Sequence, residues 1–250
     1  TCDRLVWCKC DRELALGRDW SESRMNEWIA WFLTTDRGVG GIQVLNYAHA
    51  LAVAAELRIS GSMGNASIIQ QLVGFIILCL GGTGASAMLA GEAPGWLSDP
   101  QCFWIYFFVW FAVYYSPRDV VFRLVCWRPF FRIVQVLDSF SWGFAITTWG
   151  VELPARSSNS AIRSALLPRL LCGVLSGSGG GLISDMFSLT KEDWDLETPK
   201  VYMGPSVGLA ATLVVTVIYS LAGLYPGLVP PDQLPLVKFA CILYITAVYF

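Results

Sequence analysis

The sequence predicts an all-α membrane protein with seven transmembrane helices. Of its 250 residues, 55% are hydrophobic and only 14% are charged, and the mean hydropathy is +0.53. A soluble domain carries about 25% charged residues. At about 20 apolar residues for each helix that crosses a bilayer, this length allows roughly six to eight spans. The charges are also unevenly distributed, because residues 1–37 hold 13 of the 36.

Composition and motifs exclude several classes of function. The net charge of −2 leaves no basic excess to neutralise phosphates, so we expect no nucleic-acid partner. The hydrophobic fraction is far above that of a disordered chain. The sequence contains neither an HExxH nor a Walker motif. We therefore expect a membrane protein that is not an enzyme and carries no cofactor.

Residues 1–37 form a polar N-terminal tail, and residues 38–250 form the membrane domain. The tail lacks the apolar core of a signal peptide. The sequence begins at Thr1 rather than Met and stops at Phe250 within an apolar run. We expect an incomplete chain that is truncated in its last helix.

The cysteines indicate no metal site. Cys2, Cys8 and Cys10 lie close together in the tail, but a fourth ligand is missing. His49, the only histidine, falls in a predicted membrane helix. The expected state of the cysteines is free thiols that pack as small core residues.

The first three spans are expected at Gly38–Glu56, Ile68–Ala90 and Trp96–Tyr115. Residues that interrupt helices occupy the connections between them. These residues are Gly61, Gly64 and Asn65 in the first connection and Gly91, Pro94 and Gly95 in the second.

The remaining spans are expected at Ile133–Val151, Leu166–Leu189 and Val201–Leu224, with a seventh from about Leu234. Residues 191–200 form the most charged loop of the membrane domain. Four prolines stiffen the link into the seventh span, at positions 226, 230, 231 and 235.

The basic residues of the loops predict the orientation, because cytosolic loops carry an excess of Lys and Arg. Seven lie in the loops after spans one, three and five, and three lie in the loops after spans two, four and six. The first set is Arg58, Arg118, Arg123, Arg128, Arg132, Lys191 and Lys200, and the second is Arg156, Arg163 and Lys238. This count predicts a cytosolic C-terminus, although the six basic residues of the tail favour the opposite orientation.

Two glycine clusters are the most informative feature of the membrane domain. The pore-forming candidates are Gly81, Gly82 and Gly84 in the second span and Gly177, Gly179, Gly180 and Gly181 in the fifth. Glycine is a poor helix former, by about 1 kcal/mol relative to alanine, so we expect each cluster to open its helix at membrane depth. The clusters are three spans apart, which indicates two inverted three-helix repeats with a pathway between them. The alternative is close helix packing.

Ionisable residues within spans are the second signal, because a charge at the bilayer centre costs about 2.5–3.5 kcal/mol on insertion scales. Asp138 lies in the fourth span and Arg169 in the fifth. We expect them to face a pore or lipid, or to pair with each other. Asp185, one turn after the fifth-span glycines, is expected to reach the interface.

The stretch 173–194 (GVLSGSGGGLISDMFSLTKEDW) resembles the fifth-span signature of the TRIC family, the trimeric intracellular cation channels. Its G-x-G-G corresponds to Gly177–Gly180, and its K-x-D-W to Lys191–Trp194. The second-span glycines followed by Met88–Pro94 and the turn Tyr115–Asp119 are similar to further family motifs. Weaker matches are Ala48-His49, Arg58 and Asn159-Ser160.

This resemblance implies a homotrimer with one pore in each subunit. It implies a pathway for monovalent cations, mainly potassium, in the endoplasmic or sarcoplasmic reticulum or another intracellular membrane. The current would balance charge during calcium release and uptake. The other functions considered are a secondary transporter, because inverted repeats suit alternating access, and a non-conducting membrane scaffold.

One departure from the family concerns membrane lipids. Animal members of the family that this chain resembles have a Lys-Glu-Val motif in the fourth span, with an Arg one turn later. This motif binds phosphatidylinositol bisphosphate. Those basic positions fall here on Asp138 and Trp142. We therefore expect no inositol-lipid binding there, with Arg128, Arg132 and Arg169 as an alternative basic cluster.

Overall fold

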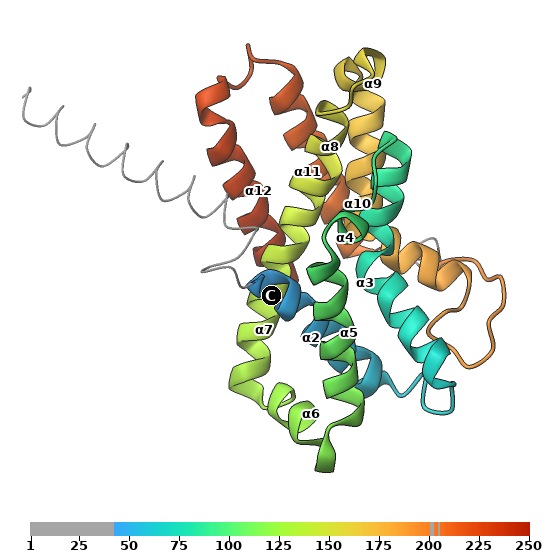
Figure 1. Ribbon diagram of the computed structural model, residues 1–250. Helices are drawn as coiled ribbons and strands as arrows, with labels where there is room; N and C mark the ends of the chain where they lie inside the picture. The colour runs from blue at the N-terminus through green and yellow to red at the C-terminus, as the bar shows by residue number, and fades with distance from the viewer. Residues whose placement is uncertain (1–42, 201–202, 205) are drawn as a thin grey trace, which may run out of the picture.

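The computed structural model describes residues 43–200, 203–204 and 206–250, and in this part all regular secondary structure is helical (Figure 1). The tail with Cys2, Cys8 and Cys10, and the start of the first expected span, lie outside the described residues. The elements in chain order are α2 (Val44–Ser60), α3 (Ile68–Ala90), α4 (Gly95–Ser98), α5 (Pro100–Tyr115), η2 (Pro117–Asp119), α6 (Val120–Val125), α7 (Arg128–Phe144), η3 (Ala145–Val151), α8 (Glu152–Ala155), α9 (Ser160–Ser164), α10 (Leu166–Met186), α11 (Val207–Leu224), η5 (Pro231–Gln233) and α12 (Leu234–Tyr249).

A helix occupies each of the seven predicted ranges. Among the described residues, four segments are long and apolar enough to cross a membrane, namely α3, α10, α11 and η5 with α12. The third range is interrupted at Asp99, where the backbone is extended before Pro100 starts α5. The fourth range consists of most of α7 and the π-helical segment η3, and α8 follows directly after it.

Local sequence signals define several helix ends. Ser67 and Gln70 form a reciprocal capping box at the start of α3. Gly91 ends the same helix with φ +76°, a left-handed conformation that glycine adopts at little cost. Asp99 caps α5 by accepting a hydrogen bond of 3.0 Å from the Gln101 N–H.

Two hydrophobic cores lie on either side of the α3–α10 contact. The first core is built from α2, α3 and α5 around Phe75 and Trp110. The second is built from η3, α11 and α12 around Ile146 and Val215. The most extensive pairings between these halves are α3 with α10 and α2 with α7. The described cysteines are free thiols, as expected from the sequence, and Cys79, Cys172 and Cys241 are buried.

The ends of the bundle are formed by different elements (Figure 1). Helix α6 and the start of α7 lie at one end, and α9 and the turn between α11 and α12 lie at the other. Large apolar side chains are exposed along the flanks, for example Ile69 (74%), Phe108 (60%) and Val207 (67%). An apolar flank of this kind is expected to face lipid, because soluble proteins rarely expose such surface.

Arg58 fastens α2 to the turn that follows α5. Its guanidinium donates hydrogen bonds to the Val113 carbonyl (2.5 Å) and to Asp119 (2.7 Å) and lies 4.3 Å from the centre of the Phe122 ring. Asp119 has φ +58°, an unusual value for a residue other than glycine. The ion pair therefore holds a strained turn in place.

Candidate ion pathway

The centre of the molecule is a crossing of α3 and α10 at their glycines, which we call the glycine crossing (Gly82, Gly179 and Gly180). A Cβ atom added at Gly82 would lie 2.5 Å from the Leu175 carbonyl oxygen, and one added at Gly179 would lie 3.0 Å from the Gly82 Cα. A Cβ at Gly180 would overlap the Leu78 carbonyl oxygen. The two backbones therefore touch, and only glycine allows this approach.

The expectation that the glycines open their helices is wrong. Helix α3 is continuous from Ile68 to Ala90 and α10 from Leu166 to Met186, with the clusters inside them. The physical reason is that packing outweighs propensity, since the missing side chains let each helix fill the groove of the other. The alternative considered from the sequence, close helix packing, describes what the structure contains.

The remaining cluster glycines have different surroundings. A Cβ at Gly81 would lie 3.2 Å from the Ile77 side chain, and one at Gly84 would lie 3.3 Å from the Trp96 indole nitrogen. Gly177 faces η3 and α11, where a Cβ would lie 2.6 Å from Ile146. Gly181 has open space around it. Of the seven cluster glycines, six therefore lie in contact with neighbouring atoms, and only Gly181 has space for a side chain.

The irregular backbone of the membrane interior lies in η3, directly after α7. This π-helical segment runs from Ala145 to Val151, and such wide turns change the hydrogen-bonding pattern of the chain and are frequent at functional sites. Ser176 of α10 donates a 2.6 Å hydrogen bond to the Ala145 carbonyl, and Ser86 of α3 donates a 3.0 Å bond to the Trp149 carbonyl. Both glycine-rich helices therefore hold η3 through hydroxyl groups.

A row of hydroxyls on α11 faces the same region. Thr212, Thr216 and Ser220 are spaced four residues apart on one helix face, and all are fully buried. Ser178 of α10 donates to Thr212 at 3.3 Å, while the hydroxyls of Thr216 and Ser220 have no hydrogen-bond partner among the described residues. Buried hydroxyls are usually hydrogen-bonded to protein groups or to ordered water. The i, i+4, i+8 spacing of these three hydroxyls is already present in the sequence.

Asp138 pairs with His49 rather than with Arg169. The His49 Nδ1 lies 2.6 Å from the Asp138 carboxylate, and the His49 Nε2 lies 3.4 Å from the Cys79 carbonyl oxygen. Both ring nitrogens thus face acceptors, an arrangement that the doubly protonated imidazole satisfies. This pair links α2, α3 and α7 in a half-buried position, with side chains 24% and 13% exposed.

Arg169 lies in the first turn of α10, where it is buried. The expected pairing with Asp138 is wrong, because α10 begins next to α9 while Asp138 lies against α2. The alternative basic cluster is also wrong. Arg128 and Arg132 begin α7 beside α6, at the end of the bundle opposite to α9 (Figure 1). A residue's position along an isolated span does not fix its partner in three dimensions.

A second charge cluster centres on Glu152 of α8, which is partly buried. Its carboxylate accepts hydrogen bonds from Lys238 (2.9 Å), Tyr219 (2.6 Å) and Arg156 (2.7 Å). Lys238, which the sequence assigns to a loop, lies within α12 with only 7% of its surface exposed. The cluster ties α8 to α11 and α12.

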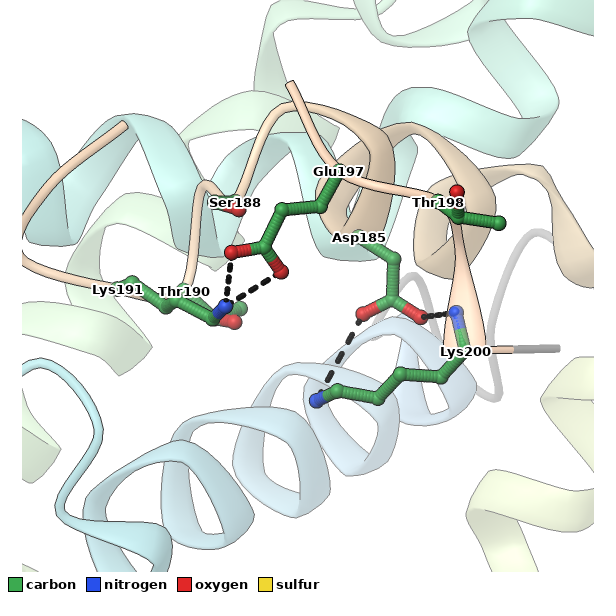
Figure 2. A pocket seen from close by; sticks show the side chains of 7 residues that line it. All are labelled: Asp185, Ser188, Thr190, Lys191, Glu197, Thr198 and Lys200. Atoms are coloured by element: carbon green, nitrogen blue, oxygen red, sulfur yellow. Dashed lines mark hydrogen bonds and ion pairs between the residues drawn. The ribbon is translucent and has the colours of Figure 1, made fainter. Parts of the chain in front are cut away.

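The charged loop after α10 forms a polar pocket (Figure 2). Asp185 accepts a 3.1 Å hydrogen bond from the Lys200 N–H, and Lys191 pairs with Glu197. The hydrogen bond from Lys191 holds the pKa of Glu197 below its ordinary value. Asp185 thus lies at the end of α10 among loop residues. The loop also contacts the start of α3, since Gln70 donates to the Glu192 carbonyl at 2.9 Å.

Comparison with known proteins identifies relatives of most of the bundle. The family model described as TRIC channel matches residues 66–249. The chain is 29% identical over 147 residues to trimeric intracellular cation channel type B of Danio rerio, covering 58% of this chain and 49% of that protein. It is 24% identical over 180 residues to the type B channel of Xenopus tropicalis, covering 72% of this chain and 61% of that protein. The chain thus spans less than two thirds of the length of these relatives.

Solved structures share the fold. A structure of a TRIC counter-ion channel, described in terms of its activity in calcium release, has a TM-score of 0.69 at 24% identity and covers 82% of this chain and 89% of that one. A trimeric intracellular cation channel from C. elegans in the absence of Ca²⁺ has a TM-score of 0.64 at 21% identity, covering 88% and 95%. At these identities the likeness establishes the arrangement of helices.

The glycine crossing predicts opposite effects of two adjacent alanine substitutions. Gly180→Ala forces the backbones apart at Leu78 and is expected to cost about 1–3 kcal/mol, as overpacking does. Gly181→Ala meets open space and gains helix propensity, so it is expected to be neutral or stabilising by up to about 1 kcal/mol. Thermal unfolding of both variants in detergent measures the difference. Equal unfolding temperatures would contradict direct backbone contact.

Proposed function

The chain belongs to the TRIC channel family, and on this premise we propose that it is a monovalent cation channel that conducts mainly potassium. The observation that carries the proposal is the family match over residues 66–249, which includes α3, α10 and the segments packed on them. We propose that it resides in the endoplasmic or sarcoplasmic reticulum, or another intracellular membrane. There its current would balance charge when calcium is released or taken up.

The proposed membrane topology has seven spans in two inverted three-helix units. The first unit is α2, α3 and α5, the second is α7 with η3, α10 and α11, and α12 is the seventh span. The separate hydrophobic cores of the two halves support this division, as does the crossing of α3 with α10, the middle helices of the two units. We propose a homotrimer in contact with membrane lipids, with one pore in each subunit. The names of the relatives as trimeric channels support the trimer.

The proposed pathway passes beside the glycine crossing rather than through broken helices. Direct contact at Gly82 and Gly180 leaves no room between the two backbones at that point. Polar groups lie on the elements that pack against α10, namely the π-helical turn of η3 and the buried hydroxyls of Thr216 and Ser220 on α11, which have no hydrogen-bond partner among the described residues. Oxygen dipoles in such positions can replace part of the water around a cation.

Asp138 is proposed to attract cations to this pathway. Its side chain is 13% exposed and lies on α7, two turns before η3. Its negative charge balances the positive charge of a protonated His49. An unbalanced positive charge near a pore would lower the local concentration of cations. The same carboxylate would repel an inositol phosphate. We therefore propose no inositol lipid at this position, where Trp142 instead donates a 2.7 Å hydrogen bond to the Gly177 carbonyl.

Potassium efflux from liposomes tests the proposed function. Vesicles loaded with potassium and containing the purified chain are expected to release it down its gradient without a co-substrate. Flux that saturates and depends on a second solute would instead identify a secondary transporter. Absence of flux from well-folded protein would favour a membrane scaffold.

Substitution Asp138→Asn is expected to lower the single-channel potassium conductance by roughly twofold or more, because it leaves His49 without its countercharge beside the pathway. Asp232→Asn in η5 removes the same charge from an exposed turn and is expected to leave the conductance unchanged. An unaltered conductance in Asp138→Asn would show that Asp138 does not attract cations to the pathway.

A further inference from the structure

His49 is the only histidine of the chain, and it lies against the carboxylate that is proposed to attract cations. Histidine is the side chain whose ordinary pKa places its change of charge at about pH 5 to pH 8. Gain or loss of one proton on this ring changes the net charge of the pair that it forms with Asp138. The pair therefore joins the proposed pathway to a group that titrates near neutral pH.

Both ring nitrogens of His49 face hydrogen-bond acceptors. Nδ1 lies 2.6 Å from the Asp138 carboxylate, and Nε2 lies 3.4 Å from the Cys79 carbonyl oxygen. The Tyr106 ring meets the imidazole edge-on, with the ring centres 6.1 Å apart. The imidazolium form donates to both acceptors, whereas a neutral imidazole has a single N–H. Because the carboxylate is the closer acceptor and is charged, the neutral ring is expected to keep its proton on Nδ1.

The charged side chains that act on His49 are both acidic, namely Asp138 of α7 and Glu56 of α2. Three further titratable side chains interact with Asp138, and all are thiols or phenols. They are Cys79 of α3, Tyr106 of α5 and Tyr249 of α12. The basic side chains of α2, α6 and α7 have other surroundings. Arg58 pairs with Asp119, Arg132 lies 6.0 Å from the centre of the Phe250 ring, and Arg123 and Arg128 are exposed.

The pair can exchange protons with water without unfolding of the bundle. The side chains of His49 and Asp138 are 24% and 13% exposed. The pair also connects three helices, because Asp138 belongs to α7 and the Cys79 carbonyl to α3, while His49 lies on α2. A change of charge on His49 is therefore placed where α2 joins the other half of the molecule.

We propose that His49 sets the charge of the cation-attracting site and thereby makes conduction depend on pH. The inference rests on the proposed function, since it requires that Asp138 lies beside the cation pathway. At low pH the imidazolium balances the carboxylate, and the pair is neutral. As the pH rises, His49 releases its Nε2 proton to water, and one net negative charge remains. This charge raises the local concentration of cations, so the conductance increases.

The protonation of His49 can be observed directly, because the chain contains one histidine. The full chain, labelled with ¹⁵N at histidine alone and held in lipid nanodiscs, is expected to give one set of imidazole NMR signals. These signals are expected to change from those of the imidazolium to those of the Nδ1–H tautomer within about pH 5 to pH 9. A ring that keeps one protonation state over this range would overturn the proposal.

Single-channel potassium conductance is measured over the same range. The wild type is expected to gain roughly twofold or more in conductance from the acidic to the alkaline end. His49→Gln keeps an N–H donor for Asp138 but has no positive charge, so its conductance is expected to be high and independent of pH. Glu56→Gln removes the other acidic side chain that acts on His49, from an exposed position on the same helix, and is expected to retain the pH dependence.

A wild-type conductance that does not change with pH would overturn the proposal, and so would a pH dependence that persists in His49→Gln. If His49→Gln does not fold, the wild type decides, because the conductance must change at the pH where the imidazole signals change. Different midpoints would overturn the proposal. Absence of current at every pH, with a His49 that titrates, would instead overturn the proposed function and with it the control of conduction by His49.

Discussion

Direct contact between the backbones of α3 and α10 is the constraint on which the rest of the structure depends. Gly82, Gly179 and Gly180 allow the two helices to touch in the middle of the molecule. This contact joins the two halves, each with its own hydrophobic core. In a membrane, where the hydrophobic effect does not drive helices together, close packing of small residues is a principal source of association. Changes at the crossing are therefore expected to affect the whole bundle.

The crossing also determines where irregular backbone can exist. Because α3 and α10 remain regular, the departure from α-helical geometry falls in η3, which packs against both. Ser86 and Ser176 reach its carbonyls from the two glycine-rich helices. Non-helical backbone at membrane depth is tolerated when protein groups or water satisfy it. The glycines therefore affect η3 indirectly. Their close packing places the hydroxyl groups of Ser86 and Ser176 against the carbonyls of η3.

Hydropathy alone located a helix in all seven expected ranges, because length and apolar character are local properties of the sequence. The two glycine clusters, three spans apart in the sequence, also indicated that α3 and α10 correspond to each other. Their continuity was not predictable from propensity, since the gain from packing exceeds the cost of each glycine. The partners of Asp138 and Arg169 were missed for a related reason. His49 is 89 positions from Asp138 in the sequence, and no local pattern connects them. Lys238 shows the same limit, because its burial depends on Glu152 of a distant helix.

Functionally, we propose a cation pathway beside the rigid crossing of α3 and α10, with the acidic residue Asp138 near it. The most direct test is the reversal potential of the purified chain in a planar bilayer that separates two concentrations of potassium chloride. Discrete openings that reverse near the potassium equilibrium potential are the predicted result. Reversal near the chloride potential, or a folded protein without discrete openings, would contradict the account.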